Sequence, residues 1–220
     1  MRALPRLVVI TDWRLPRARL LTALERALEA GPDVAVQHRH PEASGRLFLE
    51  EARLLADVCR GRTLFVNGRL EVALLVGAHL HLPASGPSPR DVRPFLPADR
   101  WVSVAVHDAR EAEGAVDADL ALVSPVFAPG SKPGDTRDTL GPHGFSGLAE
   151  RLPCPALALG GMTPERAREV PGAWGVAVIS AVLEAEDPLA AARALLDACR
   201  PPRDGGGVML RGRDALPDLR

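Results

Sequence analysis

Four polar side chains stand at the ends of short apolar runs of the chain. Gln37 and Arg39 end one run, Asn67 ends the next, and His107 ends a later one. Gln37 and Arg39 are two positions apart, so they share a face if their run is a strand. Burying an arginine is costly unless an anion or a carboxylate meets it, which favours Arg39 as a ligand contact over a structural ion pair. Histidine titrates near neutrality, so His107 is a candidate for proton transfer.

Two pairs of small residues could hold a phosphate group. Gly160 and Gly161 end an apolar run directly before a helix-start signal, and Ser180 and Ala181 lie in the next run. Adjacent glycines at such a place let backbone N–H groups approach an anion closely. Two glycines alone are a weak signal, so their place relative to the other runs decides the interpretation.

A third anion-binding candidate lies in a segment rich in glycine and proline. Ser131 and Lys132 are adjacent there, and Lys132 is the only lysine of the chain. A flexible ammonium group suits a phosphate or diphosphate, and a solvated loop lysine is the alternative. We therefore count Lys132 with His107 as candidate catalytic residues and Ser131 as a candidate binding residue.

The six histidines raise the question of a metal site. His79 and His81 are two positions apart on one run, but no HExxH or comparable carboxylate spacing accompanies them. Core or capping histidines are the better interpretation. From the residues alone we expect no metal and no cofactor.

The runs that carry these residues alternate with helical patterns. The strand-like runs are 7–13, 33–39, 63–68, 79–83, 101–107, 119–127, 155–161 and 175–182. The clearest helical patterns are 17–30, 45–59, 163–170 and 188–199, and shorter ones are 69–76, 90–96, 109–116 and 146–151. Alternation repeated eight times favours a closed parallel barrel over an open doubly wound sheet, whose first turn would be glycine-rich.

The fold predicted is therefore α/β, a single (β/α)8 TIM barrel. We expect one domain over 1–200, a long loop at 128–145 after strand six, and a disordered tail at 201–220. In this fold the carboxyl ends of the strands build the site, and the loops after strands seven and eight cradle phosphate. This topology would bring the candidate residues to one end of the barrel.

Composition excludes several classes of function. A formal net charge of -1 with 4% aromatic residues gives neither a basic footprint nor stacking rings for nucleic acid. No apolar run is long enough for a membrane span. Three cysteines far apart in the sequence are typical of reduced thiols, so we expect a cytoplasmic protein.

Taken in order, several motifs resemble the thiamine phosphate synthase/TenI superfamily of barrels. They are Ile10-Thr11-Asp12, Val36-Gln37-x-Arg39, Asn67, His81-Leu82, Val106-His107, Pro125-Val126-Phe127 with Ser131-Lys132-Pro133, Leu159-Gly160-Gly161-Met162-Thr163-Pro164 and Val178-Ile179-Ser180. The likeness covers about 8–188, most of the chain. The resemblance implies a thiazole phosphate or thiamine phosphate as the small-molecule partner, and a homodimer.

The synthase branch implies a reaction that joins a hydroxymethylpyrimidine diphosphate to a thiazole phosphate, with Mg²⁺ on the diphosphate. At the two positions where that branch carries metal-binding aspartates, this chain has Gly68 and Gly86. The final Lys of the VQxRxK stretch is Pro41, and Pro129 stands two residues before Ser131-Lys132, where the synthases carry a threonine. Mg²⁺ requires oxygen ligands, so diphosphate chemistry of that kind would be impaired.

The TenI branch is similar in Asn67-Gly68-Arg69, and its thiazole tautomerases need no metal. Their acid–base histidine corresponds to Pro125, which cannot transfer a proton. The main expectation is nevertheless a TenI-like protein that binds a thiazole phosphate and aromatises it, with His107 as the replacement acid–base group.

Other hypotheses remain open. One is a thiamine phosphate synthase with rearranged Mg²⁺ ligands, drawn from Asp91, Asp108 or Asp135. Another is a non-catalytic protein that binds a thiazole or thiamine phosphate. A different phosphate-handling barrel enzyme is the last, because a fold does not fix a chemistry.

Overall fold

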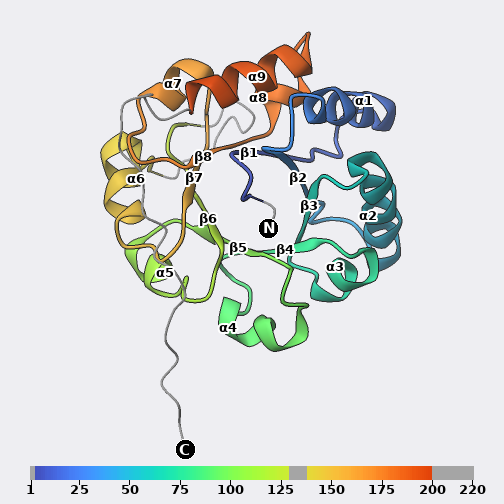
Figure 1. Cartoon of the computed structure of the whole chain (residues 1–220), viewed down its shortest axis with the longest axis horizontal. Coiled ribbons are helices and arrows are strands. Elements are labelled where there is room, and N and C mark those ends of the chain that lie inside the picture. The colour runs from blue at the N-terminus through green and yellow to red at the C-terminus, as the bar shows by residue number, and fades with distance from the viewer. Residues whose placement is uncertain (1–2, 129–137, 200–220) are drawn as a thin grey trace, which may run out of the picture.

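A computed structural model describes residues 3–128 and 138–199. Within them the chain forms a closed barrel in which each of eight parallel strands pairs with its sequence neighbours and β8 closes onto β1 (Figure 1). The predicted α/β barrel is thereby confirmed. The expected tail at 201–220 lies outside the described residues, and so do Ser131, Lys132 and Asp135.

The strands are shorter than the apolar runs that contain them. They are β1 Leu7–Ile10, β2 Val34–His38, β3 Thr63–Asn67, β4 His79–Leu82, β5 Val102–Val106, β6 Leu120–Val123, β7 Ala156–Leu159 and β8 Gly175–Val178. Nearly every strand residue is buried, because helices cover the outside of a barrel and side chains fill its interior. Arg39 and His107 therefore lie just beyond β2 and β5 at the barrel rim, whereas Gln37 and Asn67 lie within the last two positions of β2 and β3.

Helices ring the barrel in sequence order, as Figure 1 shows. They are α1 Arg17–Leu28, α2 Gly45–Cys59, α3 Leu70–Val76, α4 Pro89–Val92, α5 Ala109–Glu113, α6 Gly141–Ala149, α7 Pro164–Arg168, α8 Ser180–Leu183 and α9 Pro188–Ala198, with a 3-10 turn, η1, at Arg93–Phe95. The side chains of Ser44, Asp108, Thr163 and Asp187 accept hydrogen bonds from the first turns that follow them. None of the described helices is both long and apolar enough to cross a membrane.

Apolar side chains form two cores. The larger core lies between strands and helices, and the smaller fills the barrel with residues such as Val8, Phe65 and Leu122. Gln37 pairs in register with Phe65, so Gln37 faces the barrel interior. His38, the next residue, faces α2 instead, as the alternation of a strand requires.

Two expected boundaries were wrong. The helix predicted at 146–151 begins at Gly141, so the loop expected at 128–145 ends earlier; Pro142 in the first turn and the buried Phe145 support the helix that the glycines disguised. Ser180 and Ala181 lie in α8 rather than on strand eight. Ile179, with φ -119° and ψ -87°, leaves the strand conformation, and apolar spacing alone cannot mark such a short helix.

Candidate functional site

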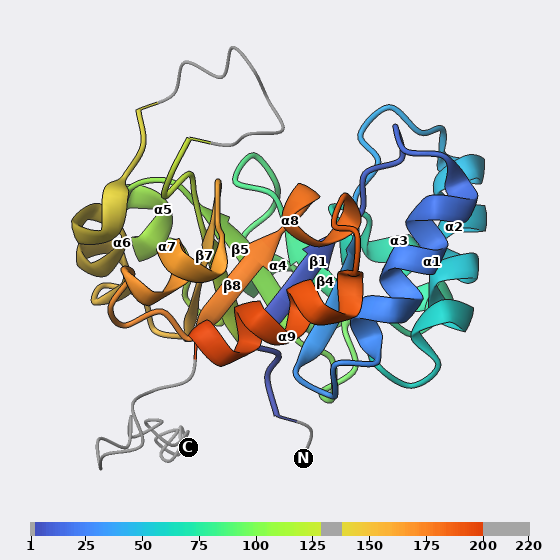
Figure 2. The same ribbon diagram turned by 90° about the horizontal axis from the view of Figure 1, so that it is seen from above.

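The candidate site is the end of the barrel where the strands finish, which Figure 2 shows from the side. Gln37 is 2% exposed, and its Nε2 atom has no hydrogen-bond partner among the described residues. A buried amide donor without a partner is unfavourable, since it loses its hydration and gains nothing in return. It therefore marks a place where a ligand acceptor, or a water molecule, completes the structure.

Arg39 lies one residue beyond the end of β2, above Gln37. The sequence-based argument placed Arg39 on a buried face, but the residue is exposed, because the strand ends at His38. Its backbone is held: the Arg39 N–H donates to Thr11 Oγ1 at 2.9 Å, and the Thr11 hydroxyl donates to the Arg39 carbonyl at 3.1 Å. Among the described residues no side chain forms a hydrogen bond or ion pair with its guanidinium, which leaves that charge available to an anion.

A buried histidine lies below the rim on β4. His81 is 5% exposed and shares a hydrogen bond of 2.8 Å between its Nδ1 and the Ser103 hydroxyl. Burial, together with the charges of Arg39 and His107, lowers the pKa of His81 to about 3. His81 is therefore neutral near pH 7 and serves as a fixed hydrogen-bonding group. The alternating HLHL of β4 placed His79 and His81 on one face, but only the fold identifies Ser103 as the partner of His81.

His107 follows β5 directly and is tied to the next helix. Its Nδ1 lies 2.8 Å from Glu111 Oε2, and its backbone N–H donates to the same oxygen at 2.7 Å. This carboxylate orients the ring and holds the proton on Nδ1, so Nε2 is left for a ligand or for proton exchange. The predicted position of His107 at a strand end is confirmed, while its catalytic role remains a prediction.

The glycine pair ends β7 in left-handed conformations, with φ of 104° at Gly160 and 58° at Gly161. A Cβ atom at Gly161 would lie 2.5 Å from the Ala128 carbonyl oxygen, and one at Gly160 would lie 3.0 Å from the Phe127 carbonyl oxygen. Close packing against the segment after β6 thus already requires both glycines, whether or not a phosphate binds there. The Arg166 guanidinium secures the turn by donating to the Gly161 carbonyl at 2.6 Å.

The candidates form two groups at the same end of the barrel. Gln37, Arg39, Asn67 and His107 belong to the ends of β2, β3 and β5, whereas Gly160, Gly161, Ser180 and Ala181 follow β7 and β8. Closure of β8 onto β1 and of β1 onto β2 places the second group beside the first.

Magnesium does not fit the positions that the synthase branch implies. Cβ atoms at Gly68 and Gly86 would both contact the ring of Pro83, at 3.6 Å and 3.3 Å, so these positions converge on a space without a carboxylate. Of the alternatives, Asp91 accepts a hydrogen bond from the Ser88 hydroxyl and Asp108 caps α5, while Asp135 lies outside the described residues. In the part of the chain that the structure describes, no three His, Cys, Asp or Glu side chains are placed to hold a metal ion.

A cavity of about 630 Å³ opens at the opposite end of the barrel. It lies where β3, β4 and β5 begin and includes His79 and Trp101. The His79 ring stacks on Trp101 with centroids 4.5 Å apart, and its Nδ1 accepts from the Trp101 N–H at 2.8 Å. The interpretation of His79 as a core histidine is confirmed, and this end of such barrels serves stability rather than catalysis.

Comparisons with known proteins agree with the fold and identify proteins of similar sequence. A sequence model of the family described as thiamine monophosphate synthase matches residues 7–182. Thiamine-phosphate synthase of Chloroflexus aurantiacus is 37% identical over 196 residues, which cover 86% of this chain and 90% of the relative. That of Azorhizobium caulinodans is 38% identical over 197 residues, covering 86% and 92%.

Solved structures include one that is similar in sequence and others that share only the fold. Thiamine phosphate pyrophosphorylase from Pyrococcus furiosus superposes with a TM-score of 0.74 at 32% identity, covering 88% of this chain and 95% of that one. The orotidine 5'-monophosphate decarboxylase of Methanocaldococcus jannaschii reaches a TM-score of 0.63 at 15% identity, which shows a shared fold alone.

Proposed function

Since the chain belongs to the thiamine monophosphate synthase family, we propose that it is a transferase that joins a hydroxymethylpyrimidine diphosphate to a thiazole phosphate. The observation that carries the proposal is the match to curated thiamine-phosphate synthases over nearly their whole lengths. These relatives favour the synthase hypothesis over the TenI-like tautomerase that we expected from Asn67-Gly68-Arg69. Pro125 in place of an acid–base histidine is consistent with this preference.

In this proposal the two halves of the rim bind the two substrates. Gln37 and Arg39 receive the diphosphate, the Gln37 amide as a neutral donor and the Arg39 guanidinium as a charged one. Gly160, Gly161, Ser180 and Ala181 receive the thiazole phosphate, and Asn67 and His107 lie at strand ends that can serve both. Ser131 and Lys132 remain candidate anion contacts on sequence alone, because they lie outside the described residues.

The reaction breaks the bond between the pyrimidine-bearing carbon and the diphosphate oxygen and forms a bond from that carbon to the thiazole ring. Negative charge builds on the departing oxygen, so a donor held in place before the reaction lowers the barrier. At this end of the barrel the chain supplies the guanidinium of Arg39, the amide of Gln37 and the neutral imidazole of His81. Holding the two substrates together contributes further, because it converts an encounter in solution into a step within one complex.

The test is to incubate the purified protein with both substrates and measure thiamine phosphate and released inorganic pyrophosphate. Equal amounts of both products are expected. A parallel sample with the thiazole carboxylate phosphate tautomer, followed by NMR, measures aromatisation. Aromatisation without thiamine phosphate would replace the proposal with a tautomerase, and binding without either product would replace it with a non-catalytic binding protein.

A further inference from the structure

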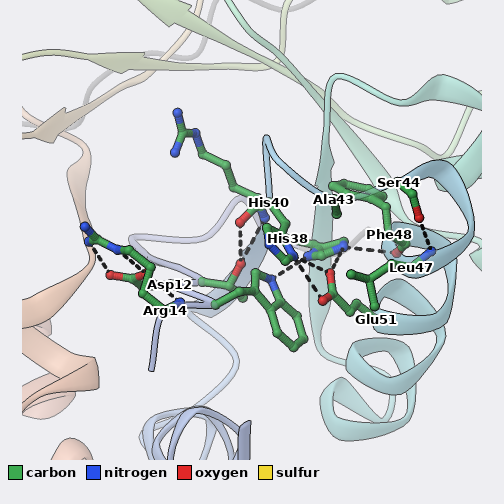
Figure 3. Close-up of polar contacts among 12 residues, drawn as sticks. Asp12, Arg14, His38, His40, Ala43, Ser44, Leu47, Phe48 and Glu51 are labelled. Carbon is green, nitrogen blue, oxygen red and sulfur yellow. Dashed lines mark hydrogen bonds and ion pairs between the residues drawn. The ribbon is translucent and has the colours of Figure 1, made fainter. Parts of the chain in front are cut away.

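A polar network lies behind Arg39, between β2 and α2, away from the barrel interior. It consists of Trp13, His38, His40 and Glu51, which we call the β2–α2 network, and Figure 3 shows three of these residues by label. The Glu51 side chain is 7% exposed, and its Oε2 atom lies 2.9 Å from His40 Nδ1 and 3.6 Å from His38 Nε2. None of the four takes part in the proposed chemistry directly.

His38 is the centre of the network and has a defined protonation state. Its ring is fully buried, and burial lowers the pKa of His38 to about 4. A neutral imidazole has one donor and one acceptor nitrogen. Because Nδ1 accepts from the Trp13 indole N–H at 3.2 Å, Nε2 carries the proton and donates to the Phe48 carbonyl at 3.1 Å.

The network joins three elements that meet at the rim. Trp13 belongs to the loop after β1, His38 and His40 lie at the end of β2, and Glu51 projects from α2. The Trp13 ring also stacks on His40, with centroids 5.8 Å apart and planes 11° from parallel. Both neighbours of Arg39 are therefore fixed by side-chain contacts, while Thr11 fixes the Arg39 backbone itself.

Burying the Glu51 carboxylate has a free-energy cost, so its presence in the network needs a physical reason. A buried carboxylate is favourable only when its partners offset the lost hydration, and an apolar replacement is often as stable. Glu51 meets His40 through both of its oxygens, at 3.0 Å and 2.9 Å. What Glu51 provides that an apolar residue would lack is a directional contact to the residue following Arg39.

We propose that Glu51 is a positioning residue for Arg39: through His40 and Trp13 it holds the end of β2 so that the Arg39 guanidinium meets the diphosphate part of a substrate at the rim. The inference rests on the proposed function for the role of Arg39. With Glu51 neutralised, the His40 contact weakens and the 38–40 segment gains freedom, so anion binding then includes an ordering cost.

The first experiment measures the binding of inorganic pyrophosphate by titration calorimetry in four proteins: the natural chain, Glu51→Gln, Arg39→Ala and the double variant. Glu51→Gln should raise Kd about tenfold in the natural background and leave it unchanged in the Arg39→Ala background, since the coupling exists only through Arg39. Glu50→Gln is the matched control, because Glu50 is an exposed neighbour on the same helix and should bind as the natural chain does.

A kinetic readout separates positioning from general loosening. Glu51→Gln should lower kcat/KM for the pyrimidine diphosphate about tenfold, with the KM for thiazole phosphate within about twofold of the natural value. If Glu51→Gln does not fold, Trp13→Phe tests the same network, because it removes the indole N–H and keeps a ring against His40.

Three results would overturn the inference: unchanged pyrophosphate binding in Glu51→Gln, an equal loss in the Arg39→Ala background, or no binding by the natural chain. If Glu51→Gln weakens pyrophosphate binding only when Arg39 is present, but the natural chain has no transferase activity, the positioning role holds and the proposed function is refuted. The two failures are therefore distinguishable.

Discussion

Replacing Gly161 by alanine tests whether the turn after β7 is as tightly packed as the structure indicates. Three costs add up at this position. Alanine at a φ of 58° costs about 1–2 kcal/mol relative to glycine. The new Cβ, 2.5 Å from the Ala128 carbonyl oxygen, forces a backbone shift that costs about 1–3 kcal/mol.

The third cost concerns Arg166. Its Nη1 atom would lie 2.8 Å from the new Cβ, so the guanidinium must move and give up its hydrogen bond to the Gly161 carbonyl. Such a bond contributes about 1 kcal/mol. The free energy of unfolding should therefore fall by about 4 kcal/mol, a large part of the total for a domain. Urea denaturation followed by circular dichroism measures it.

Alanine substitutions at two other glycines separate the cost of the backbone conformation from the cost of the close contacts. Gly172 has a φ of 77°, and a methyl group added there would meet nothing within 4 Å, so Gly172→Ala should cost only the backbone strain of about 1–2 kcal/mol. Gly147 lies inside α6 at an ordinary φ and is also free of contacts, so Gly147→Ala should stabilise the protein by about 0.5–1 kcal/mol. A Gly161→Ala variant no less stable than Gly172→Ala would refute the close approach to Ala128.

Three further predictions concern pH, His107 and magnesium. His38 and His81 have pKa values lowered from 6.5 to about 4 and about 3, so below pH 6.5 these two histidines bind protons in the unfolded chain but not in the folded one. The free energy of unfolding should be highest above pH 6.5 and fall toward pH 4 by about 1.4 kcal/mol per pH unit for each histidine. Measured by urea titration at several pH values, this slope should decrease by the contribution of one histidine in His81→Gln. His143→Gln, at an exposed position, should leave the slope unchanged. His107→Asn should lower transferase turnover while calorimetry still detects thiazole phosphate binding, and undiminished turnover would exclude His107 from the chemistry. Because Gly68 and Gly86 supply no carboxylate, titration of the protein with Mg²⁺ alone should give no saturable binding by calorimetry; saturable binding would require ligands that the described residues do not show.

The barrel could be predicted from the sequence because its signal is repeated. Eight alternations of strand and helix patterns leave few topologies, and an error of a few residues at one element does not change the result. The errors occurred where a single element had to be identified alone. In α6 the glycines at 141, 144 and 147 suggest a loop, whereas Pro142 in the first turn and the buried Phe145 indicate a helix. Packing against neighbouring elements decides such cases.

The positions of the site residues were predictable for the same reason, but their partners were not. The rule that strand ends build the site placed Gln37, Arg39 and His107 at one end of the barrel. No local pattern indicates that Glu51 meets His40 or that Ser103 bonds to His81, because these pairs join separate elements. The burial argument for Arg39 also failed, since a shift of one residue at a strand end moves a side chain from the interior to the rim.

The arginines near the rim differ in how their charges are used, and this difference supports Arg39 as the anion contact. Three of them are committed within the protein: Arg14 to Asp12, Arg69 to the Ala43 carbonyl and the Phe48 ring, and Arg166 to the Gly161 carbonyl and the Phe127 ring. A guanidinium already hydrogen-bonded gains less from a ligand, because the new contact replaces an old one. Arg39 has a fixed backbone and, among the described residues, no hydrogen-bond or ion-pair partner for its guanidinium. We therefore expect an anion at this rim to gain most from Arg39, while Glu51 and His40, in the positioning role proposed for them, hold the segment that carries it.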